Sequence, residues 1–179
     1  MKQLTFNKLL LRTAFSCMAC DGDIDKREVA LIKDMLIDDQ IFDSIEINQH
    51  LDNLLIEINK DSHQFIRHYF NDLINFGLSE QEELKLIEVA INTIKADEKV
   101  EYSEVKFFKV IRSKLKISNE SILALHPDFE EYLEQDIISE AYLAKLQDDF
   151  FDTHNLPKFE LLSSIDINSF KNINIINEG

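Results

Sequence analysis

The chain has 179 residues, an ordinary apolar content of 45% and a formal net charge of −15. This length supports one domain with a hydrophobic core, and the acidic balance leaves too few basic side chains to neutralise nucleic-acid phosphates or an anionic membrane surface. Only 3 glycines and 2 prolines occur, which favours long helices with few sharp turns. We therefore predict an all-α helical bundle of about seven to nine helices.

The N-terminal segment lacks the features of a secretion signal. Lys2, Lys8 and Arg12 are dispersed within a helical pattern instead of preceding an apolar run. No apolar run of the sequence reaches the length that spans a bilayer. We expect a cytoplasmic protein that neither inserts into membranes nor binds nucleic acid.

Apolar residues recur with the 3.6-residue period of a helix from the start of the chain. The first predicted helix is capped by Thr5 or Asn7 and ends at Cys17 and Cys20. A thiol at a helix C-terminus is not activated by the helix dipole, so we expect these two cysteines to pack rather than to react. A second helix is predicted from about Lys26 to Asp38.

Two further helices are predicted in the middle of the chain. The third is clear from Ile47 onward, and the fourth begins at Asp61 or Ser62. Gly77 lies just past the end of the fourth helix, where glycine commonly terminates helices.

The second half of the domain continues the helical pattern. Ser79 and Glu82 have the spacing of a capping box, which starts a fifth helix. A sixth helix follows around residues 105–115, a short one starts near Ser118, and residues 129–152 again show a helical period.

The helical period weakens after Pro157. We predict a domain over residues 1–155 and a non-helical tail, rich in Ile and Asn, over residues 156–179.

An acidic turn occurs twice in the chain, at residues 20–28 and again at residues 96–104. Superposing the copies matches Glu28 with Glu104, and the flanking apolar residues match as well, which indicates a duplicated helix–turn–helix unit. The candidate metal ligands are the carboxylates of the two turns: Asp21, Asp23, Asp25, Glu28, Asp97, Glu101 and Glu104.

Two interpretations of the first turn are open on its spacing alone. Its carboxylates alternate as in an EF-hand, but Lys26 and Ile32 stand where that loop needs Gly and Glu. Oxygen ligands from the turn, together with Glu28, would still suit calcium or magnesium. A capping box of Asp25 and Glu28 explains the same residues without a metal.

The pattern of Gly22, Ile24 and Glu28 between two helices, with a degenerate second copy, resembles the TerB (tellurite-resistance) family of bacterial domains. The resemblance covers roughly residues 6–150. It implies an all-helical bundle whose acidic turns hold divalent cations, in stress-response or phage-defence systems. Because Glu98 replaces the family's glycine in the second turn and Lys99 adds a competing positive charge, we expect a cation to bind the first turn more tightly.

The resemblance implies a non-catalytic interaction module, and the sequence contains no nucleotide-binding glycine loop or hydrolase motif that would indicate an enzyme. Two alternatives are an acidic immunity protein that masks the basic site of a toxin or nuclease, and a metal-dependent hydrolase. Residues 126–155 are strongly acidic, with Lys145 the one basic residue apart from histidines. We therefore expect a protein partner with a basic surface.

Overall fold

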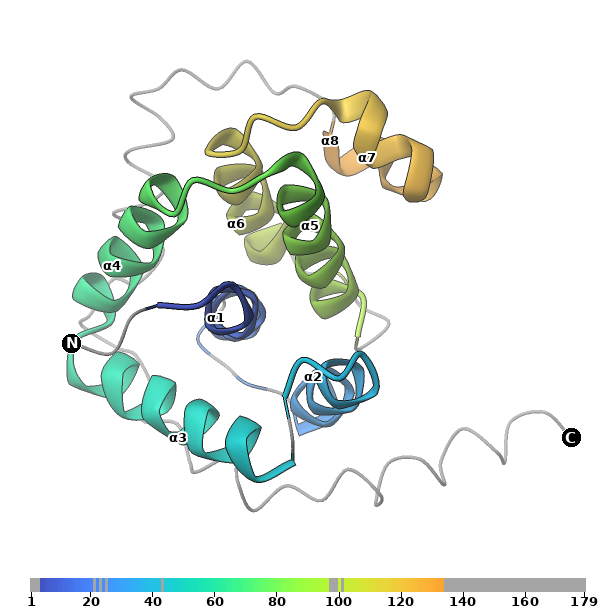
Figure 1. The fold of residues 1–179 in the computed structure, drawn as a ribbon. Helices are drawn as coiled ribbons and strands as arrows, with labels where there is room; N and C mark the ends of the chain where they lie inside the picture. The colour runs from blue at the N-terminus through green and yellow to red at the C-terminus, as the bar shows by residue number, and fades with distance from the viewer. Residues whose placement is uncertain are drawn as a thin grey trace, which may run out of the picture.

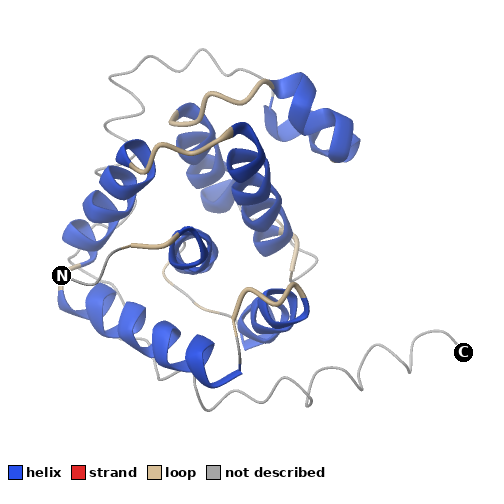
Figure 2. Cartoon of the chain, viewed as in Figure 1, coloured by secondary structure: helices blue, strands red, loops and turns tan. Residues whose placement is uncertain are grey.

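The computed structural model describes residues 4–20, 22, 24, 26–42, 44–96, 100 and 102–133. These residues form α-helices and one short 3₁₀ turn, with no β-strand among them, which confirms the predicted all-α bundle (Figures 1 and 2). The elements are α1 (Phe6–Ala19), α2 (Lys26–Asp38), α3 (Ser44–Lys60), α4 (Ser62–Asn75), α5 (Glu80–Ile94), α6 (Tyr102–Ser113), α7 (Asn119–Leu125), η1 (Pro127–Phe129) and α8 (Glu130–Leu133).

Helix α1 is the centre of the bundle. Figure 1 shows it end-on, with α2, α3, α4 and α5 around it. Every residue from Leu9 to Ala19 is buried except Arg12, as expected for a helix that is apolar on nearly all sides. Its most extensive contact is with α5.

The two helix–turn–helix units of the duplicated sequence pack against each other. Helices α1 and α2 form one unit, and α5 and α6 form the other. The leading helices α1 and α5 pack on each other, while α1 also contacts α6 and α5 also contacts α2. Each unit therefore covers part of the other, and neither buries its apolar face alone.

The predicted helix starts are confirmed at the level of hydrogen bonds. The side chain of Thr5 accepts from the backbone N–H of Lys8, and that of Asp61 accepts from Gln64. The full capping box of Ser79 and Glu82 is present at the start of α5. These caps satisfy backbone donors that the first turn of a helix leaves without partners.

Two features of the predicted helices differ from expectation. Helix α3 begins at Ser44, before the apolar pattern becomes clear at Ile47. Ile74, which continues the apolar series of α4, is 55% exposed. Leu73, the preceding residue, is buried in the core, whereas Ile74, the last apolar residue of α4, lies on the surface.

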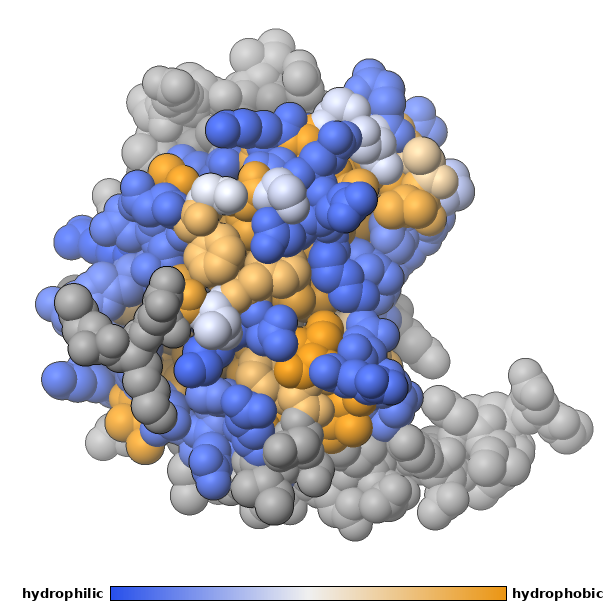
Figure 3. All heavy atoms as spheres, viewed as in Figure 1, coloured by the Kyte–Doolittle hydropathy of each residue, from blue (hydrophilic) through white to orange (hydrophobic). Residues whose placement is uncertain are grey.

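The surface is mainly polar, with apolar atoms gathered in the middle of one face, over the end of α1 (Figure 3). At this end the rings of Phe6 and Phe76 lie 6.3 Å apart, and both pack against the core while remaining partly exposed. No helix within the described ranges is both long and apolar enough to cross a membrane. The predicted tail at 156–179 and the helical pattern beyond Leu133 lie outside the described residues.

Candidate functional site: the two acidic turns and the Arg12 trough

Glu28 and Glu104, the matched glutamates of the two acidic turns, occupy the first turns of α2 and α6. Their exposed fractions are 5% and 4%, although glutamate is rarely so buried. A carboxylate near a helix N-terminus is stabilised by the partial positive charge of the unpaired N–H groups. The duplicated sequence thus gives two equivalent buried carboxylates, one at the start of each second helix.

Both carboxylates affect the pKa of the Cys17 thiol. Burial raises the pKa of Cys17 well above its ordinary value, and the negative charges of Glu104 and then Glu28 raise it further. Both carboxylates therefore act electrostatically on this one fully buried thiol in the last turn of α1. The first turns of α2 and α6 therefore both act on one residue of the central helix.

The chemistry of Cys17 follows from this position. Its raised pKa favours the protonated thiol at neutral pH, so Cys17 is not an activated nucleophile. Cys17 and Cys20 are not joined in a disulfide and are both buried, which agrees with the packing role expected from their place at a helix C-terminus.

The other five predicted ligands, Asp21, Asp23, Asp25, Asp97 and Glu101, lie outside the described residues. Gly22, between the first two of them, has a φ of 90°, which is the positive value expected for this glycine. Ile24 is partly buried and packs against the core, so the turn is anchored to the bundle.

Glu28 and Glu104 are the two predicted cation ligands that the structure describes. Within the described part of the chain, no three His, Cys, Asp or Glu side chains are grouped as a metal site. The carboxylates of Glu28 and Glu104 are hard oxygen donors of the type that calcium and magnesium prefer. Metal binding by the turns thus stays a prediction.

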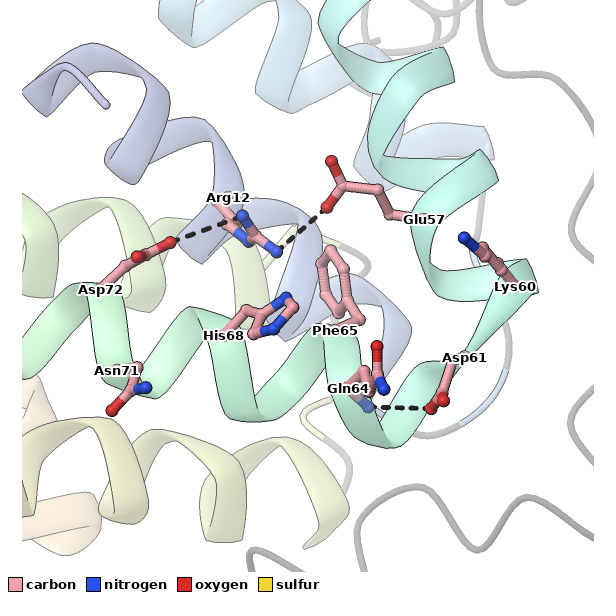
Figure 4. Close-up of a pocket in the computed structure, with 9 residues that line it drawn as sticks. All are labelled: Arg12, Glu57, Lys60, Asp61, Gln64, Phe65, His68, Asn71 and Asp72. Carbon is pink, nitrogen blue, oxygen red and sulfur yellow. Dashed lines mark hydrogen bonds and ion pairs between the residues drawn. The ribbon is translucent and has the colours of Figure 1, made fainter. Parts of the chain in front are cut away.

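A second feature, which was not predicted from the sequence, is a trough centred on Arg12. One Nη atom of Arg12 lies 3.1 Å from the Glu57 carboxylate on α3, and the other lies 3.5 Å from Asp72 on α4 (Figure 4). The guanidinium also lies over the ring of Phe65, 4.8 Å from its centroid. Arg12 is the one charged residue in the otherwise buried stretch from Leu9 to Ala19, and this was the signal available in the sequence.

The trough consists of two adjoining hollows that share Arg12, Glu57 and Asp72. The smaller, of about 430 Å³, lies between α3 and α4, and the larger, of about 550 Å³, extends along α1 and α3. Both are open to solvent. The remaining lining residues are Lys60, Asp61, Gln64, Phe65, His68 and Asn71 in the smaller hollow and Leu4, Lys8, Leu11, His50, Asn53, Leu54 and Ile56 in the larger.

No family model, curated protein or solved structure matches this chain. Two features of the molecule bear on its function. They are the buried carboxylates of Glu28 and Glu104 beside Cys17, and the trough around Arg12.

Proposed function

We propose that this protein is a non-catalytic, TerB-like interaction module that binds calcium or magnesium at its paired acidic turns. It would serve a bacterial stress-response or defence complex by presenting these turns to a protein partner with a basic surface. The observation that carries the proposal is the burial of Glu28 and Glu104, which occupy matching positions in the first turns of α2 and α6.

Electrostatics supports a cation beside these carboxylates. A carboxylate in a poorly solvated environment is stabilised by a positive charge beside it. A bound divalent cation would supply that charge and tie the first turns of α2 and α6 together. The carboxylates of Glu28 and Glu104 would provide hard ligands from the helices, and the turn residues before them would provide the rest.

The charge of the chain supports a basic partner. The net charge of −15 favours encounter with a Lys- or Arg-rich surface and disfavours encounter with an acidic one. In the described part of the acidic segment, Glu130 and Glu131 are exposed. Residues 134–155 of that segment lie outside the described residues, so their part in the interface rests on sequence alone.

Titration calorimetry with calcium and with magnesium tests the cation. We expect Glu28→Gln with Glu104→Gln to weaken binding by about tenfold or more, because two ligand charges are removed. The matched control, Asp38→Asn with Glu80→Gln, removes two exposed acidic charges at the ends of α2 and α5 that are remote from the turns, and it should bind as the wild type does. Equal binding by all three proteins, or by none, would remove the cation from the proposal.

The two turns should differ in affinity. Gly22 takes a positive φ that lets carbonyl oxygens approach an ion, whereas the second turn has Glu98 and the competing ammonium of Lys99. We expect Asp21→Asn with Asp25→Asn to abolish the tighter binding event, and Asp97→Asn with Glu101→Gln to affect only a weaker one. The reverse order would contradict the inequality of the turns.

The partner is tested by capture on the immobilised protein, followed by association kinetics across a range of salt. An electrostatically steered association rate falls steeply with ionic strength. An association rate that changes neither with salt concentration nor with the change of Glu130 and Glu131 to Gln would exclude the acidic segment from the interface. Capture of a toxin or nuclease would favour the acidic-inhibitor alternative.

A further inference from the structure

Helices α2 and α5, one from each duplicated unit, meet along a contact that is partly open to solvent. The side-chain amide of Asn92 on α5 donates a hydrogen bond to the sulfur of Met35 on α2, at 3.7 Å. Nearby, Lys85 on α5 pairs with Asp39, which directly follows α2, at 2.7 Å. The thioether of Met35 is therefore held against α5 beside a defined amide donor.

Met35 is also partly exposed, whereas Met18, in the last turn of α1, is only 2% exposed. An oxidant dissolved in water therefore reaches the sulfur of Met35 more readily. The duplication provides an internal comparison, because Ile111 on α6 and Ser16 on α1 occupy the positions that match Met35 and Asn92. Both of these residues are fully buried, so the thioether and its amide occur at the more exposed of the two matching contacts.

We propose that Met35 is a site of reversible oxidation by hydroperoxides, and that Asn92 receives the oxygen of the resulting methionine sulfoxide. The thioether sulfur attacks one oxygen of the peroxide, gives up two electrons and gains that oxygen as the O–O bond breaks. The other peroxide oxygen takes up a proton and leaves as water or an alcohol. This site is separate from the acidic turns and does not depend on the function proposed for them.

The role of Asn92 follows from the polarity of the product. Oxidation turns an apolar side chain into a polar one, and it disrupts packing where the new oxygen has no hydrogen-bond donor. Met35 packs against the core, so its sulfoxide would carry this cost. The amide of Asn92 already donates to the sulfur and can donate to the new oxygen, because the flexible methionine side chain adjusts easily. Helices α2 and α5 therefore stay packed in the oxidised protein.

Peptide mass mapping after graded treatment with hydrogen peroxide tests the modification. In the folded protein we expect Met35 to be oxidised about tenfold faster than Met18, or more, and in urea the two rates should be similar. Methionine sulfoxide reductases of both stereospecificities, added with a thiol reductant to the native oxidised protein, should restore the original mass of the Met35 peptide. Oxidation of Met18 as fast as Met35 in the folded protein, or a Met35 sulfoxide that the reductases leave in place, would overturn the proposal.

Urea unfolding before and after oxidation tests the role of Asn92. We expect oxidation to lower the unfolding midpoint about 0.5 M further in Asn92→Ala than in the wild type, because the alanine leaves the sulfoxide oxygen without its donor. Asn75→Ala, which removes an exposed asparagine from the end of α4, is the matched control and should respond to oxidation as the wild type does. Met35→Leu keeps the apolar volume and should show no shift after the same treatment.

Asn92→Asp is the second variant, because aspartate keeps the shape of asparagine but has no amide donor, and it should respond as Asn92→Ala does. Equal midpoint shifts in the wild type and in both Asn92 variants would overturn the role of the amide. Loss of cooperative unfolding in the oxidised wild type would contradict it as well. A shift that persists in Met35→Leu would place the effect at another residue and overturn the proposal.

Discussion

Tyr69, Thr13 and Cys17 are polar core residues whose surroundings keep them neutral or hydrogen-bonded. The hydroxyl of Tyr69 donates to Thr13 at 3.1 Å, and the hydroxyl of Thr13 donates to the backbone carbonyl of Leu9 at 2.9 Å. Burial raises the pKa of Tyr69 well above its usual range, so the phenol stays neutral. Cys17, near Tyr69, is kept neutral by the same cause and by Glu104 and Glu28.

The raised pKa of Cys17 predicts that stability falls in base. Above the ordinary thiol pKa of about 8.5, the unfolded chain releases this proton while the folded chain retains it. The unfolded state then binds fewer protons, so the free energy of unfolding decreases with rising pH, by at most about 1.4 kcal/mol per pH unit for one thiol.

Urea unfolding of the wild type and of Cys17→Ala measures this effect. We expect the variant to be less stable at neutral pH because it leaves a cavity, but to lose less stability between about pH 8 and pH 10. Between about pH 6 and pH 8 the two curves should be parallel, because the thiol is neutral in both states. Equal slopes in base would show that Cys17 ionises as readily in the folded protein as in the unfolded chain.

At the scale of elements, local signals placed most helix boundaries. The start of α5 is defined by a capping box in which Ser79 and Glu82 bond each other's backbone N–H. The end of α4 is followed by Gly77, whose φ of 76° is the left-handed conformation that favours glycine. These contacts join residues a few positions apart, so the residue types alone specify them.

The cap of α5 predicts a defined cost. We expect Ser79→Ala to lower the free energy of unfolding by about 1 kcal/mol, because the N–H of Glu82 loses its acceptor. Ser79→Asp is the matched control, since aspartate caps helices as well as serine does and should keep most of the stability. Chemical denaturation of the three proteins measures the difference, and an alanine variant as stable as the wild type would show that the cap does not contribute.

At the scale of the whole molecule, the second unit is joined to the C-terminal helices by a buried carboxylate. Glu83, in the first turn of α5, is 6% exposed and accepts the backbone N–H groups of Lys116 and Ile117, at 2.9 and 2.6 Å. These two residues lie between α6 and α7, so one side chain fixes the path of the chain from the bundle to its last described helices.

Removing this carboxylate should destabilise the whole domain. We expect Glu83→Ala to cost about 2–4 kcal/mol, because two backbone donors, one of them buried, lose their acceptor. Glu88→Ala, on the same helix but with a side chain that is 38% exposed, should cost less than about 1 kcal/mol. Denaturant unfolding compares the two variants, and similar losses would mean that the Glu83 contacts are not a major source of stability.

The sequence by itself determined the helical class, the duplication, most helix ends and the burial of the cysteines, because periodicity and capping act over a few residues. Helix α2, for example, spans Lys26–Asp38 as its apolar period predicts. The exceptions are the early start of α3 and the exposed Ile74, neither of which the apolar period predicts.

Only the tertiary structure decided which distant side chains meet. The sequence matched Glu28 with Glu104, but their shared effect on the pKa of Cys17 follows from the packing of α1 and α5 and of each on the other unit. In the same way, Arg12 could be noted as a charge in a buried helix, whereas its pairing with Glu57 and Asp72 depends on where α3 and α4 lie. Local patterns carry no information on such contacts, because they depend on how whole helices pack around α1 and not on the spacing of residues along one helix.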